Sequence, residues 1–74
     1  MGNTIAEADK VESFLSEQYS GNELEGILKL AVRAHEMSEG SMVMAIGIVA
    51  MRYVDRKVLT RAQCDKVLKM MDPS

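Results

Sequence analysis

Apolar residues recur along the chain every three or four positions, the spacing that places them on one face of an α-helix. Four segments show this pattern, and turn-forming residues separate them: 4–19, 22–38, 41–56 and 60–71. No stretch of useful length alternates between apolar and polar residues with the period of two that a half-buried strand shows. The pattern therefore predicts an all-α fold with four helices.

Residues suited to helix ends support these limits. Thr4 with Glu7, and Thr60 with Gln63, have the spacing of a capping box, in which each side chain accepts a hydrogen bond from the other residue's backbone N–H. Gly40 is expected to end the second helix, because glycine readily adopts the left-handed conformation found there.

The expected core collects apolar residues from the stripe of each segment. They are Val11, Leu15, Leu24, Ile27, Leu28, Ala31, Val43, Ile46, Ala50, Val54, Val67 and Leu68. Links of two to five residues favour antiparallel neighbours, so the simplest assembly is one domain, residues 1–74, folded as a compact bundle of four short helices. The alternative is an extended helical hairpin that a second subunit completes.

The segment 41–56 differs from the others because it is apolar around nearly its whole circumference. On a helical wheel, Arg52 lies on its polar side, yet Met44, Ala45 and Ile48 lie on or beside that same side. A helix of this kind is either central in its bundle or shared with a partner.

Methionine is abundant, with seven among 74 residues. Adaptable binding surfaces use this flexible and polarisable side chain heavily, although several methionines could simply fill a small, irregular core. Exposed in a monomer, Met44, Ile48 and Met51 would form an unfavourable apolar patch. We expect these three residues and Arg52 to bind a partner, both another copy of the chain in a homo-oligomer and another protein.

Charge is unevenly distributed along the chain, although the net charge is only −2. Residues 1–40 carry eight acidic and three basic side chains, a net charge of −5. Residues 41–74 carry three acidic and six basic side chains, a net charge of +3. We expect the acidic half to lie against the basic half, either within one chain or between subunits.

Basic residues gather around the end of the third segment, at Arg52, Arg56, Lys57 and Arg61. Two guanidiniums one helical turn apart can grip a carboxylate or a phosphate. The simpler interpretation is that these cations favour the negative end of a helix dipole. If they bind phosphate, the protein would sequester an anionic small molecule, such as a nucleotide, between subunits.

Catalysis is poorly supported. His35 is the only histidine and lies on the apolar stripe of the second segment, where a core or interface position is expected. Cys64 is the only cysteine and lies on the inner stripe of the fourth segment, where a thiol behaves as a small hydrophobe. One histidine and one cysteine make no metal set, and the glycines form no phosphate-binding loop. We therefore expect no enzyme, no cofactor and no metal.

The remaining features narrow the class of protein. Hydrophobic residues make up 47% of the chain and charged residues 27%, which is typical of a globular protein. The longest apolar run, residues 42–51, is about half a membrane span, and residues 1–10 lack the apolar core of a signal peptide. An acidic chain without a basic recognition face is not expected to bind DNA. The leading hypothesis is a cytoplasmic, non-enzymatic regulator, inhibitor or adaptor.

Overall fold

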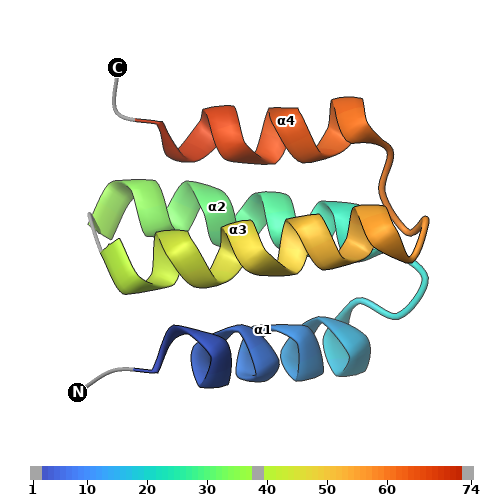
Figure 1. The fold of residues 1–74 in the computed structure, drawn as a ribbon, viewed down its shortest axis with the longest axis horizontal. Helices are drawn as coiled ribbons and strands as arrows, with labels where there is room; N and C mark the ends of the chain where they lie inside the picture. The colour runs from blue at the N-terminus through green and yellow to red at the C-terminus, as the bar shows by residue number, and fades with distance from the viewer. Residues whose placement is uncertain (1–2, 38–39, 73–74) are drawn as a thin grey trace.

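Four α-helices make up most of the computed structural model, which describes residues 3–37 and 40–72 (Figure 1). They are α1 (Thr4–Gln18), α2 (Glu23–Met37), α3 (Gly40–Asp55) and α4 (Arg61–Met71). No strand occurs in these two ranges. The predicted all-α fold is therefore confirmed, and each helix lies within two residues of its predicted limits.

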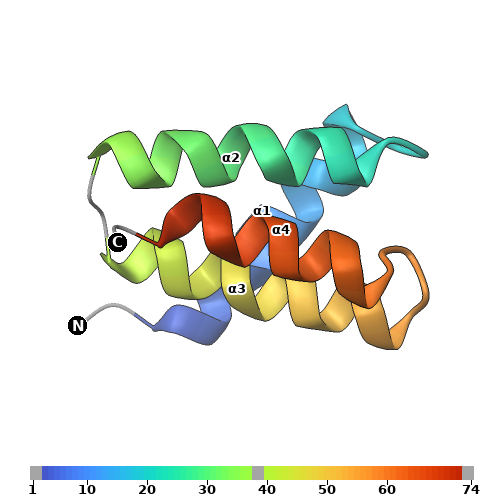
Figure 2. The ribbon, with the colours of Figure 1, turned by 90° about the horizontal axis from the view of Figure 1, so that it is seen from above.

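The helices α2 and α3 form an antiparallel hairpin, and α1 and α4 pack on opposite sides of it (Figures 1 and 2). Each outer helix contacts both helices of the hairpin, and α1 does not contact α4. The bundle measures 29 × 27 × 20 Å. The predicted compact bundle is confirmed and the extended hairpin is wrong, because α1 and α4 fold back to bury their own apolar stripes against the hairpin.

The core receives side chains from all four helices and from Leu59 in the link before α4. Six of the expected core residues are completely enclosed: Leu15, Ile27, Ala31, Ile46, Ala50 and Val67. Five others are partly buried: Val11, Leu24, Leu28, Val43 and Val54. The prediction that Leu68 is a core residue is wrong. The helix α4 turns Cys64, Val67 and Met71 inward and leaves Leu68 exposed at the edge of that face.

The part of the polar side of α3 that carries Arg52 and Arg56 faces α1. Ala45 is completely buried there, and Arg52 reaches carboxylates on α1. Arg52 therefore marks a contact between two helices and not an open surface.

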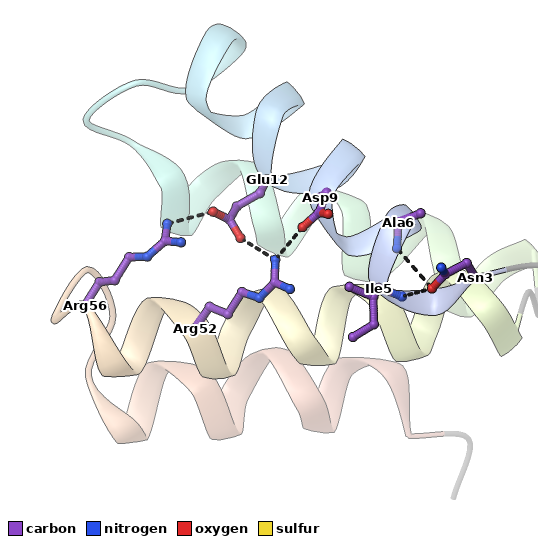
Figure 3. Close-up of polar contacts among 7 residues, drawn as sticks. All are labelled: Asn3, Ile5, Ala6, Asp9, Glu12, Arg52 and Arg56. Atoms are coloured by element: carbon purple, nitrogen blue, oxygen red, sulfur yellow. Dashed lines mark hydrogen bonds and ion pairs between the residues drawn. The ribbon is translucent and has the colours of Figure 1, made fainter.

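Helix ends agree with the sequence only in part. Thr60 and Gln63 form the predicted capping box of α4, with donor–acceptor distances of 2.9 and 3.1 Å. The cap predicted at Thr4 is wrong: the Asn3 side chain accepts two backbone N–H groups of the first turn of α1, at 3.0 and 3.4 Å (Figure 3). Asparagine is the better cap, so α1 begins right after it. Gly40 opens α3 instead of ending α2.

The end of α1 approaches α2 closely at Gly26. A Cβ atom at this position would lie 2.6 Å from Leu15 Cδ2 and 2.7 Å from two ring atoms of Tyr19. The missing side chain therefore lets α1 pack tightly enough to enclose Leu15 completely.

We expect Gly26→Ala to lower the free energy of unfolding by about 1–2 kcal/mol, because the overpacking cost exceeds the gain in helix propensity. The matched control is Gly47→Ala in α3, where an added Cβ would meet only Leu68 Cδ2 at 3.6 Å. That substitution should stabilise the fold by up to about 1 kcal/mol. Urea unfolding of both variants at low chain concentration measures the difference. A Gly26→Ala variant as stable as Gly47→Ala would contradict the close approach.

Candidate functional site

Four charged side chains tie α1 to α3 (Figure 3). Arg52 Nη1 donates hydrogen bonds to Asp9 Oδ1 at 2.9 Å and to Glu12 Oε1 at 2.8 Å. Arg56 Nη1 donates to the second oxygen of the same carboxylate, Glu12 Oε2, at 2.7 Å. Two guanidiniums one turn apart therefore grip a carboxylate of their own chain. The expected contact between acidic and basic halves is found here within one chain.

Glu12 is the most enclosed member of this network, with 17% of its side chain exposed against 29% for Arg52 and 56% for Arg56. The hydrogen bond from Arg52 lowers the pKa of Glu12; the bond from Arg56 and the charges of both arginines act in the same direction, while burial opposes them. Hydrogen bonds to Glu12 and Asp9 raise the pKa of Arg52. Glu12 and Arg52 are therefore both charged at neutral pH.

The ion pairs change the interpretation of the basic group Arg52, Arg56, Lys57 and Arg61. Its two α3 members already bind Glu12. Lys57 lies in the turn after α3 with a positive φ of 63°, and Arg61 begins α4. An anionic ligand at the arginine pair would have to compete with Glu12, which already binds both guanidiniums.

Between its sides facing α1 and α4, α3 presents apolar side chains to solvent. Met44 is 62% exposed and Met51 is 63% exposed, the largest values for large apolar side chains in residues 3–37 and 40–72. Ile48 lies between them on the helix and is partly buried against the core. The three apolar residues chosen from the sequence therefore lie on one side of α3, and Arg52 borders them toward α1.

Two residues that the sequence did not indicate as partner-binding, Leu68 and Ile5, extend the apolar surface of α3 onto α4 and α1. Leu68 of α4 packs beside Gly47 and is exposed. Ile5 of α1 lies one turn before Asp9 and points toward α3 (Figure 3). The helices α1 and α3 run in the same direction in the view of Figure 1, but α1 crosses the hairpin obliquely in the view of Figure 2. We call Ile5, Met44, Ile48, Met51 and Leu68 the α3 face.

A hollow of about 280 Å³ lies between α3 and α4 at one edge of the α3 face. Met51 and Leu68 line it together with Arg61, Asp65 and the enclosed Cys64. Burial, helped by the charge of Asp65, raises the pKa of the Cys64 thiol, which therefore stays protonated at neutral pH. The predicted inward position of Cys64 is confirmed.

The chemistry of the other candidate residues is plain. His35 is exposed in the last turn of α2, so a core position for it is wrong; α2 instead turns Ile27, Ala31 and Ala34 inward. Within the described parts of the chain, no three His, Cys, Asp or Glu side chains gather in a way that could hold a metal ion.

None of the helices in residues 3–37 and 40–72 combines the length and apolar character needed to cross a membrane.

A second apolar area, which the sequence analysis missed, lies in a groove of about 410 Å³ lined by α1, α2 and the start of α3. Phe14 and Met37 are its exposed apolar members, and Met42 is partly buried. Charged Lys10 and Arg33 also line it. Its apolar residues are divided among three helices, whereas the α3 face has a continuous stripe along a single helix.

Tyr53 of α3 carries a buried hydroxyl that has no hydrogen-bond partner among the described residues. Only 3% of the residue is exposed. Burial raises the pKa of Tyr53, and the nearby charges of Glu12 and Glu23 raise it further. Tyr53 therefore contributes ring volume to the core at the cost of an unsatisfied polar atom.

Comparison with protein-family models, with curated proteins and with solved structures gives no match for this chain.

We expect Glu12→Gln to lower the free energy of unfolding at pH 7 by roughly 0.5–1.5 kcal/mol. The folded pKa of Glu12 lies below its ordinary value of 4.5, so its stabilising effect is complete above that value and is lost as the pH falls through the folded pKa. The difference between wild type and variant should therefore shrink in acid. Urea unfolding from pH 7 to about pH 3 tests this, with exposed Glu17→Gln as the control. A pH-independent difference would contradict the ion-pair origin.

We expect Tyr53→Phe to raise the free energy of unfolding by about 0.5–1 kcal/mol, because it removes an unpaired buried hydroxyl and keeps the ring. The raised pKa of Tyr53 means that wild type also loses stability as the pH rises above the ordinary value of 10.0, since the unfolded chain ionises first. The variant should not show the part of the stability loss at alkaline pH that comes from ionisation of Tyr53. Thermal unfolding at neutral and alkaline pH measures both effects, and a less stable variant would show that the hydroxyl has a partner.

Proposed function

We propose that this protein is a small, cytoplasmic, non-enzymatic regulator, inhibitor or adaptor that acts by burying the α3 face against protein, and that it works as a homo-oligomer. The observation that carries the proposal is the exposure of Met44 and Met51 on one side of the most apolar helix. Burying these two side chains against a partner contributes about 3–6 kcal/mol before the costs of association.

The composition of the α3 face suits recognition of protein. Its centre is apolar, while Asp9, Arg52 and Arg56 form a charged border toward α1, and Arg61 and Asp65 lie toward α4. Protein interfaces commonly combine an apolar centre with a polar rim. The methionines are flexible on a helix that is packed on three sides, which allows one surface to fit both another copy and a different protein.

A binding role is also supported by the state of the reactive side chains. The Cys64 thiol is enclosed and protonated, and a thiol must ionise to act as a nucleophile. Sequestration of a nucleotide or a similar anion is the weaker candidate, because Glu12 already binds Arg52 and Arg56.

Charge placed on the α3 face should separate the subunits. We expect Ile48→Asp, and a double variant with Met44→Asp and Met51→Asp, to lower the mass seen in light scattering toward that of one chain, with helicity largely unchanged. The double variant is the cleaner test, because both methionines are more than 60% exposed and contribute little to the monomer core.

The control is Val32→Asp, which places the same charge on an exposed apolar position of α2. Its mass should equal that of wild type. If the wild type and the double variant have equal masses while both are helical, the proposed surface is wrong.

A further inference from the structure

We infer that the partner covering the α3 face is a second copy of this chain, packed so that the two α3 helices cross in antiparallel directions at Gly47 and Ile48. This inference rests on the proposed function and names its partner and geometry. It comes from the arrangement of residues along α3, which is nearly symmetric about its own midpoint.

The two exposed methionines of α3 form a pair about that midpoint. The helix runs from Gly40 to Asp55, so its centre lies between Gly47 and Ile48. Met44 and Met51 lie at equal distances on either side and are almost equally exposed, at 62% and 63%. A two-fold axis through the centre therefore places Met44 of one copy opposite Met51 of the other. An isologous interface requires this kind of self-complementary surface.

The crossing point coincides with the glycine at the centre of α3. Gly47 has no side chain, and a Cβ added there would meet only Leu68 Cδ2, at 3.6 Å. A second helix can therefore approach the backbone of α3 at its centre, while the methionines of both copies pack on either side of the crossing. Leu68 lies beside Gly47, so the Leu68 side chains of both copies lie near the axis and add to the apolar centre.

The charges on α3 favour the antiparallel direction over the parallel one. The antiparallel arrangement places Asp55 of each copy beside the first turn of the partner's α3, where the helix dipole is positive. That first turn contains no acidic residue of its own. A parallel arrangement would instead bring the two Asp55 carboxylates together, which is unfavourable.

Disulfide trapping tests the geometry directly. In a Cys64→Ala background, chains carrying Met44→Cys and chains carrying Met51→Cys are mixed in equal amounts and mildly oxidised. One variant is isotopically labelled, because the two have the same mass. We expect mixed disulfides to exceed like-with-like disulfides on the order of tenfold. In the antiparallel arrangement, the same cysteine in the two copies is offset along the helix axis by seven residues, about 10 Å. A disulfide needs Cα atoms within about 7 Å, so like-with-like disulfides are disfavoured.

The control replaces Met51→Cys with Met37→Cys, an exposed position on α2 outside the α3 face. This pair should form no mixed disulfide above the background of random collision. Circular dichroism checks that every variant keeps the helicity of the parent.

The experiment distinguishes failure of the antiparallel arrangement from failure of the proposed function. A predominant like-with-like disulfide at Met44→Cys, or a dimer whose mixed disulfide does not exceed the Met37→Cys control, overturns the antiparallel arrangement and leaves the proposed function standing. A parent chain with the mass of a monomer at concentrations up to about 1 mM overturns both the arrangement and the homo-oligomeric form of the proposed function.

Discussion

A helix that is apolar around nearly its whole circumference needs cover on every side, and α3 receives it from its own chain on three. The hairpin partner α2 covers one side, while α1 and α4 pack on two others. Ala45, Ile46, Val49, Ala50 and Tyr53 are buried as a result. The fourth side exposes Met44 and Met51, which no helix within residues 3–37 and 40–72 covers. The proposed function follows from this one uncovered side.

Ion pairs and apolar packing together hold α1 against the hairpin. Ala8 and Leu15 of α1 are completely enclosed, and Gly26 lets the end of α1 pack closely on α2. Arg52 and Arg56 add hydrogen bonds to the two oxygens of Glu12. The sequence suggested this pair of arginines as an anion site, whereas in the structure the pair binds a carboxylate of its own chain.

The sequence predicted what depends on periodicity and local hydrogen bonding. Four helices, the capping box at Thr60 and the inward position of Cys64 are all found. The errors concern what depends on neighbouring elements: His35 lies on an apolar stripe yet is exposed, and Leu68 lies at the edge of its face rather than in the core. Ile5 carries no local signal of its role, because its place at the α3 face depends on how α1 and α3 pack.

The most direct measurement is the solvent accessibility of individual methionine methyl groups, observed by NMR with a soluble paramagnetic agent at low and high chain concentration. We expect the methyl groups of Met44 and Met51 to become protected as the concentration rises, while that of Met37, exposed on α2, stays accessible. Equal accessibility of all three methyl groups at about 1 mM chain would contradict it, because the α3 face would then be bare in solution.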